Sequence, residues 1–294
     1  MAVDQTDGID RPRWLEALRQ LPLGVSMAAI VLTAIVLAAV LAPLIAPFDP
    51  TRQALLLRLK PPGHTTAAGA VYWLGTDDLG RDLFSRIVYG AQVSLLVAVL
   101  SVSFSLLVGT ALGMLAAWHR GAVEIAIMRL VDTMLSIPAI LFAVLTVAVL
   151  GPSFFKLVLV LGLTRWPRYT RVDYAQTLQV ATLPYIRAAE LAGASGVRIL
   201  LRHILPNIAG PMMVVATAEF GLMILFEAGL SFLGLGIQPP TPSWGSILSA
   251  GRQYVERAWW LILFPGGALF ALVLTVNLLG DWLRDKLDPR AQTR

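Results

Sequence analysis

The chain has 294 residues, of which 57% are hydrophobic and only 14% are charged. Soluble domains carry about 25% charged residues, so this composition, with a mean hydropathy of +0.73, excludes an ordinary soluble protein and indicates several membrane crossings. The chain has no cysteine, which excludes disulfides and thiol chemistry. None of its three lysines follows a glycine, which excludes the nucleotide-binding loop G-x-x-x-x-G-K-S/T.

The N-terminal region predicts a tail and one membrane span. Residues 1–22 are polar and carry three arginines, which is typical of a cytoplasmic tail. Residues 23–46 follow as the first transmembrane helix. Leu23 to Leu41 form an uncharged run of nineteen residues, which is enough to cross a hydrocarbon core of about 30 Å. A cleaved signal peptide is the alternative, but its apolar region is only about 7–15 residues long.

Residues 47–92 are predicted to form an extracytoplasmic segment. Prolines and glycines are too frequent in most of it for regular structure, and its string Gly-Thr-Asp-Asp-Leu-Gly-Arg-Asp ends at Asp82. A short helix with Leu79, Leu83 and Ile87 on its apolar face is expected to lie along the outer membrane surface. The aspartates lack the D-x-D-x-D-G spacing of a calcium loop, so we assign no metal to them.

Residues 93–283 are predicted to hold the other five spans. In the second span, Val93 to Trp118, the pair Gly109 and Gly113 suits close packing against another helix.

Charges mark the start of the third span. Arg129 and Asp132 are three residues apart, so they share one helix face and are expected to pair near the inner surface. A transport role for the two charges is the alternative. Pro138 is expected to kink this helix.

The fourth predicted span, residues 154–169, is charged at both ends. Lys156 and Arg165 would have to reach opposite membrane surfaces for about 15 residues to cross. A re-entrant segment is the alternative, but it would place the loop that follows on the outer side.

Residues 171–207 form a charged stretch between two apolar regions. Pro184 is well placed to start a helix, Gly193 interrupts it, and a second helical run ends at Pro206. The pattern predicts a short helix, a sharp turn and a second helix that enters the membrane. An ordinary cytoplasmic loop is the alternative.

The fifth predicted span, residues 208–232, contains Glu219 and Glu227. Intramembrane acids are costly, so they are expected to face the bundle interior or an aqueous path. Both residues could line a translocation route, near a cationic group of the substrate. Alternatively, they hydrogen-bond neighbouring helices, and we favour this second interpretation for Glu227.

The C-terminal region predicts an outer loop, a sixth span and a tail. Three prolines and three glycines between residues 230 and 248 favour ordered turns, and Ala258 to Leu279 can cross the membrane. Residues 284–294 are read as a cytoplasmic tail. With both ends inside, fifteen lysines and arginines lie inside and eight outside. This asymmetry explains the net charge of +5 without a nucleic-acid partner.

Three stretches resemble a known family, the permease subunits of bacterial ABC importers. The family loop reads E-A-A, three residues, G, nine residues, I-x-L-P. This chain has both alanines, the glycine and the Leu-Pro, with Arg187 in place of the glutamate and His203 in place of the isoleucine. The resemblance implies that the loop docks on a separate ATPase subunit. Its residues here are Arg187, Ala188, Ala189, Glu190, Gly193, Ala194, Ser195, Leu205 and Pro206.

The other two stretches indicate which branch of the family the chain resembles. The string that ends at Asp82 and the outer loop at 230–248 are both similar to the C-type permeases of dipeptide, oligopeptide and nickel importers. This implies an all-α integral membrane protein with six transmembrane helices, the type I ABC importer permease fold and both termini inside. The implied partners are a second homologous permease, two ATPases that bind the ATP, and an extracytoplasmic solute-binding protein, all at the bacterial inner membrane.

Two other classes of protein were weighed. An ion-coupled secondary transporter could use the two glutamates as relays, but such carriers usually show an internal repeat and we find none. An intramembrane enzyme would need a polar pair or a metal site inside the spans. The three histidines all fall in predicted loops and no G-x-S-x-G motif is present, so we expect no catalysis and no cofactor in this chain.

Overall fold

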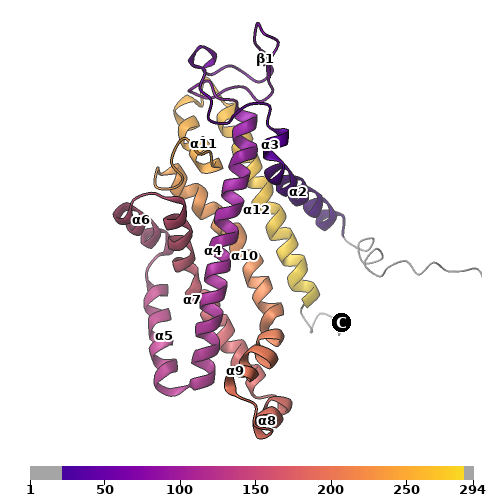
Figure 1. Cartoon of the computed structure of the whole chain (residues 1–294), viewed down its shortest axis with the longest axis vertical. Helices are drawn as coiled ribbons and strands as arrows, with labels where there is room; N and C mark the ends of the chain where they lie inside the picture. The colour runs from indigo at the N-terminus through magenta and orange to yellow at the C-terminus, as the bar shows by residue number, and fades with distance from the viewer. Residues whose placement is uncertain (1–21, 288–294) are drawn as a thin grey trace, which may run out of the picture.

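The computed structural model describes residues 22–287, so the predicted tail at 1–22 and the end of the tail at 284–294 lie almost wholly outside the described residues. It is a long helical bundle with a small irregular cap at one end (Figure 1). Its α-helices are α2 (Leu23–Val40), α3 (Ala42–Ile45), α4 (Leu83–His119), α5 (Gly121–Ser136), α6 (Ala139–Leu150), α7 (Phe154–Ala181), α8 (Pro184–Leu191), α9 (Gly196–Ile199), α10 (Leu205–Phe232), α11 (Trp244–Gly251) and α12 (Trp260–Leu287).

The remaining elements are short. The cap contains the 3-10 turn η1 (Leu55–Leu57) and an antiparallel pair of strands, β1 (His64–Thr65) and β2 (Val71–Tyr72), in which His64 lies opposite Tyr72. A π-helical turn, η2 (Leu200–Ile204), joins α9 to α10, and the 3-10 turn η3 (Arg252–Tyr254) follows α11.

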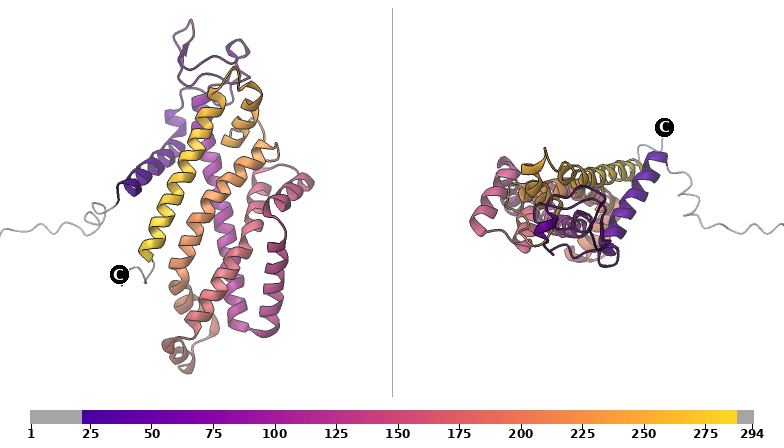
Figure 2. Two further views of the ribbon diagram at one scale, coloured as in Figure 1. Left: turned by 180° about the vertical axis from the view of Figure 1, so that it is seen from behind. Right: turned by 90° about the horizontal axis from the view of Figure 1, so that it is seen from above.

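Helix α4 runs through the middle of the bundle, and α7 lies against it over a long stretch (Figures 1 and 2). Glycines make this approach possible. A Cβ on Gly109 would lie 2.5 Å from Cβ of Tyr169, and one on Gly113 would lie 2.7 Å from the carbonyl oxygen of Thr170. The predicted close packing at this glycine pair is therefore confirmed, and α7 is the partner helix.

Helix α2 leaves the bundle obliquely, as the views from behind and from above show (Figure 2). It contacts α4 and α12 near the cap and diverges from them toward its N-terminal end. An apolar cavity of about 600 Å³ lies between α2 and the helices α4, α10 and α12.

The prediction of a separate interfacial helix before the second span is wrong. Leu83 instead opens α4, which continues without a break for 37 residues. Asp82 caps its start, because the Asp82 carboxylate accepts a hydrogen bond of 2.8 Å from the backbone N–H of Ser85. Burial raises the pKa of the Asp82 carboxyl, and the hydrogen bonds from Ser85 oppose that shift. Gly90 is the only glycine or proline between Leu83 and the predicted start of the span at Val93, and α4 passes through it without interruption.

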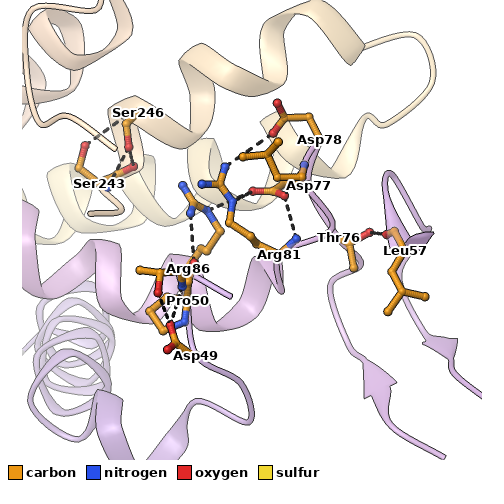
Figure 3. A network of polar contacts seen from close by, with 12 residues as sticks. Asp49, Pro50, Leu57, Thr76, Asp77, Asp78, Arg81, Arg86, Ser243 and Ser246 are labelled. Carbon is orange, nitrogen blue, oxygen red and sulfur yellow. Dashed lines mark hydrogen bonds and ion pairs between the residues drawn. The ribbon is translucent and has the colours of Figure 1, made fainter. Parts of the chain in front are cut away.

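The cap is held by a buried ion network on the N-terminal side of α4 (Figure 3). The carboxylate of Asp77 lies 2.6 Å from Nε of Arg81 and 3.3 Å from Nε of Arg86, and all three side chains are at most 6% exposed. Arg86 also donates a hydrogen bond of 3.2 Å to the carbonyl oxygen of Pro50. Trp260 of α12 closes the other side, donating from its indole N–H to the carbonyl oxygen of Thr76 at 3.1 Å.

The third predicted span is broken rather than kinked. Helices α5 and α6 meet at an angle of 87° across Ile137 and Pro138. The break lies at the proline where a kink was predicted, but its angle is larger than that of an ordinary kink. The prediction that Arg129 pairs with Asp132 is wrong, because Asp132 forms its ion pair with Arg171 of α7. Tertiary packing therefore supplies a closer partner than the helix itself.

Four described helices are long and apolar enough to cross a membrane, and the bent pair α5–α6 would make five. The four are α2, α4, the continuous run Gly196–Phe232, and α12. Helix α7, which contains the predicted fourth span, is long enough at 28 residues but is not among them. The charged residues of α7 are the reason that it does not qualify as a span by composition.

Substituting Gly109 tests the contact between α4 and α7. We expect Gly109→Ala to lower the free energy of unfolding by about 1–3 kcal/mol, because the new methyl group would overlap Tyr169 and the carbonyl oxygen of Trp166 at 2.6 Å. Thermal unfolding of the purified protein in detergent measures it. Gly267→Ala in α12 is the matched control, since a Cβ there meets nothing within 4 Å. Equal midpoints for the two variants would contradict the close contact.

Candidate functional site

Residues 171–181 of the loop predicted at 171–207 instead continue α7. The rest of the loop, with α8 and α9, lies at the end of the bundle opposite the cap (Figure 1). Helix α8 ends at Leu191, and Gly193 then adopts the left-handed conformation with φ +82°. The N–H groups of Gly193 and Ala194 donate to the carbonyl oxygens of Glu190 and Ala189, at 2.9 and 3.1 Å. This is the hydrogen-bonded turn that commonly ends a helix at glycine, so the predicted sharp turn at Gly193 is present.

One side of the loop is anchored to the bundle. Ile186 of α8 and Ile199 of α9 are fully buried and pack with Met114 near the C-terminal end of α4. Gly196 allows a close approach, because a Cβ there would lie 2.8 Å from the indole nitrogen of Trp118. The loop is therefore held in place by α4 rather than hanging from its two ends.

The opposite side of the loop is open to its surroundings. Most of the residues expected to contact an ATPase are exposed, and the others are half-buried. The exposed ones are Arg187, Ala188, Glu190, Gly193, Ser195 and Pro206, and the half-buried ones are Ala189, Ala194 and Leu205. A Cβ on Gly193 would meet nothing within 4 Å. Ala194 and Leu205 pack against the buried cluster of the anchored side, so only the other expected residues can form the open surface, with Arg187 at the position where the family motif has glutamate. Their contact with an ATPase stays a prediction.

The loop is continuous with a helix that reaches far into the bundle. From Gly196, through α9 and η2, to Phe232, the backbone forms one helical run of 37 residues. Glu219 lies midway along α10, about 21 Å from its start at a rise of about 1.5 Å per residue. If the loop were displaced and this helical run moved with it, Glu219 would change position as well.

Glu219 is fully buried and lies against two arginines of α7. Its carboxylate oxygens are 3.5 Å from Nε of Arg165 and 3.1 Å from a terminal nitrogen of Arg168. The guanidinium of Arg165 also lies over the ring of Phe226, 4.5 Å from its centre. The expectation that Arg165 reaches a membrane surface is therefore wrong, because a buried carboxylate gives it a partner inside the bundle.

Glu227, two turns farther along α10, makes hydrogen bonds instead. Its carboxylate accepts from the hydroxyl of Ser94 on α4 at 2.9 Å and from the hydroxyl of Ser231 at 2.7 Å, and the side chain is fully buried. This geometry matches the interpretation favoured for Glu227, in which the acid bonds a neighbouring helix. A role for either glutamate in a translocation route stays a prediction.

Helix α7 carries functional candidates that the sequence did not single out. Asp173 is buried, and its Oδ2 accepts a hydrogen bond of 2.6 Å from the hydroxyl of Thr110. Its Oδ1 and the hydroxyl of Thr177 are buried without a partner among residues 22–287. Charges at 165 and 168 in the predicted fourth span, and at 173 in the predicted loop, were the available signal, but the acid that pairs with the first two lies about fifty residues away.

The comparisons with known proteins agree with this architecture. The family described as "Binding-protein-dependent transport system inner membrane component" matches residues 109–293. A second family, described as the N-terminal transmembrane domain of oligopeptide transport permease C, matches residues 24–62. The chain therefore belongs to the family of binding-protein-dependent transport system inner membrane components, and the resemblance to ABC importer permeases is confirmed.

Individual relatives extend the match over most of the chain. The Di/tripeptide transport system permease protein DppC of Pseudomonas aeruginosa is 44% identical over 87% of this chain and 84% of its own. The Dipeptide transport system permease protein DppC of Alkalihalophilus pseudofirmus is 38% identical over 95% of this chain and 91% of its own. DppC of Escherichia coli is 41% identical over 86% of this chain and 84% of its own.

A solved structure shows the same fold. An inward-facing conformation of the MetNI methionine ABC transporter contains a chain that aligns with a TM-score of 0.56 at 19% sequence identity. The alignment covers 70% of this chain and 98% of the other. At that identity the likeness concerns the fold, which is that of a type I ABC importer permease.

Removing the charge of Glu219 tests the buried cluster. We expect Glu219→Gln to lower the free energy of unfolding by about 3 kcal/mol, because Arg165 would be left buried without a counter-charge. Thermal unfolding in detergent measures the loss, and Glu190→Gln in the exposed part of the loop is the control. The double variant Glu219→Gln/Arg165→Gln should recover part of the loss. A Glu219→Gln variant as stable as the unmodified protein would show that the pairing contributes nothing to stability.

Proposed function

We propose that this chain is a permease subunit of an ATP-driven importer for peptides. It would form the translocation path with a second, homologous permease. Two ATPase subunits would bind the ATP, and an extracytoplasmic binding protein would deliver the solute. The observation that carries the proposal is the exposed loop around Gly193, which is anchored to α4 and continuous with α10.

The substrate class is proposed from the relatives. Three of them are named as dipeptide or di/tripeptide permeases, and they are similar over more than four-fifths of this chain. These names favour peptides over the nickel chelates that the sequence resemblance also allows.

Six crossings with both termini inside remain part of the proposal. Four helices, or five with α5–α6, satisfy the length and composition of a span, and α7 would be the remaining crossing. Two arginines of α7 pair with Glu219 of α10, and Arg171 pairs with Asp132 of α5, so these three charges have partners on neighbouring helices. The chain would then lie in the bacterial inner membrane, with the loop on the cytoplasmic side.

The mechanism follows from the rigid link between loop and bundle. When the ATPase subunits close, the loop would move with them, and α9, η2 and α10 would carry that movement to Glu219. Because Glu219 holds α7 through Arg165 and Arg168, both helices would shift together and change which end of the path is open. The chain needs no cofactor and no covalent chemistry for this step.

A secondary transporter working alone is the alternative proposal. It would use the buried acids of α10 as relays, whereas the structure holds the carboxylate of Glu219 between two arginines. Uptake of peptide by this chain alone, in vesicles without ATP, would support the alternative.

The proposed orientation can be tested by cysteine labelling, since the chain has no cysteine of its own. Leu191→Cys and Leu56→Cys place a thiol in the loop and in the cap, at side chains that are 91% and 95% exposed. We expect an impermeant maleimide to label position 56 in intact spheroplasts and position 191 only after permeabilisation. Labelling of position 191 from outside would invert the orientation and remove the ATPase contact.

The coupling role of the loop can be tested at Gly193. We expect Gly193→Val to leave membrane insertion unchanged and to abolish ATP-driven uptake, because a β-branched residue is an outlier at φ +82° and its side chain projects onto the exposed surface. Peptide uptake and co-purification of the ATPase measure the effect. Gly193→Asn is the control, since asparagine adopts this conformation far more readily, and it should keep most of the activity. Normal uptake by the valine variant would contradict the coupling assignment.

A further inference from the structure

One side of α5 and α7 exposes a row of polar side chains. In the C-terminal half of α7 the exposed residues are Arg168, Arg171, Ala175 and Gln179, and one face of α5 exposes Arg129, Asp132, Thr133 and Ser136, next to the exposed Leu130 and Leu135. The two rows are joined by the ion pair of Arg171 with Asp132. We call these eight residues the polar face.

The polar face lies on the uncovered side of α7. Helix α4 packs along the opposite, buried side, while α10 and α5 flank α7 and have no extensive contact with each other. Figure 1 shows α5 and α7 side by side, with α4 along them. The polar face is therefore a part of α7 that residues 22–287 leave open.

The polar face is unsuited to contact with lipid. Arginine, aspartate and glutamine side chains are costly against acyl chains, so where this face lies within the membrane it must face a bundle interior or an aqueous path. The neighbouring helix α6 shows what a lipid-compatible surface looks like here, because its exposed residues include Val149 at 84% and Leu145 at 65%.

Positive charge is in excess around Arg168, at one end of the polar face. Among the described residues, Arg165 and Arg168 share the single carboxylate of Glu219, so these three side chains together carry one positive charge in excess. Glu219 is 1% exposed and Arg165 is 15% exposed, whereas Arg168 is 57% exposed. Arg168 is thus the member of the cluster that an incoming group can reach, and it lies midway along α7.

We propose that Arg168 is a substrate-binding residue that recognises the C-terminal carboxylate of a peptide crossing the membrane. This inference rests on the proposed function of the chain as a peptide permease. A guanidinium group binds a carboxylate through charge-assisted hydrogen bonds, often two in parallel. The sequence alone suggested the opposite sign, a cationic group of the substrate near Glu219, but the two arginines neutralise that carboxylate and leave a site for an anion.

Glu219 would position Arg168 rather than bind the peptide. The 3.1 Å contact holds one guanidinium nitrogen and leaves others free to donate to a second carboxylate. Since Glu219 belongs to the helix that runs from the loop, movement of the loop would change the position of Arg168 as well. Binding and release of the carboxylate would then be linked to the state of the ATPases.

The test uses the whole importer in liposomes with its binding protein, and it compares two substrates. These are the dipeptide Ala-Ala and its C-terminal amide, each at a concentration that calorimetry shows to saturate the binding protein. We expect Arg168→Gln to slow uptake of Ala-Ala by about tenfold, because a charge-assisted hydrogen bond is lost, and to leave uptake of the amide unchanged. Arg168→Lys should keep much of the preference for the free carboxylate.

A neighbouring arginine provides the matched control. Arg171 is 55% exposed but already paired with Asp132, so Arg171→Gln should affect both peptides equally. Equal slowing of both peptides by Arg168→Gln, or no slowing, would overturn the inference. If that equal loss came with weaker co-purification of the second permease, Arg168 would belong to the contact between permeases. An unmodified importer that takes up neither peptide with ATP would overturn the proposed function itself, whatever Arg168 does.

Discussion

The interaction on which the rest of the bundle depends is the contact of Glu219 with Arg165 and Arg168. An unpaired charge at this depth costs several kcal/mol, so α10 and α7 can move only in ways that keep the pair together or replace it. Helix α7 is in turn held to α4 by the close contact at Gly109. One buried carboxylate therefore links the helix that starts at the loop to the helix that carries the polar face.

The two ends of the molecule are built in different ways. At the capped end, the buried pairing of Asp77 with Arg81 and Arg86 fixes an irregular segment that has little regular secondary structure to stabilise it. At the other end, only one side of the loop is packed, and Leu191 is almost fully exposed. A rigid cap and an open loop suit a subunit that must keep one end folded and offer the other to a partner.

Helix α7 shows how a charged segment can belong to a membrane protein. Its hydrophobic stretch is short, and by composition it does not qualify as a span. Three of its arginines are nevertheless paired with acids on two other helices, Glu219 on α10 and Asp132 on α5. Hydrophobicity measured along one helix cannot detect this, because the compensating groups are close only in space.

The sequence by itself determined the membrane class, the family, the turn at Gly193 and the glycine pair at Gly109. Each of these depends on composition or on residues close together along the chain, where local backbone preferences decide the outcome. Only the tertiary structure decided that the helix after Asp82 runs on into the bundle, that Asp132 pairs with Arg171, and that Glu219 lies between two arginines. These features depend on which helices become neighbours, because the stability of a charge in a membrane is set by its nearest partner in space.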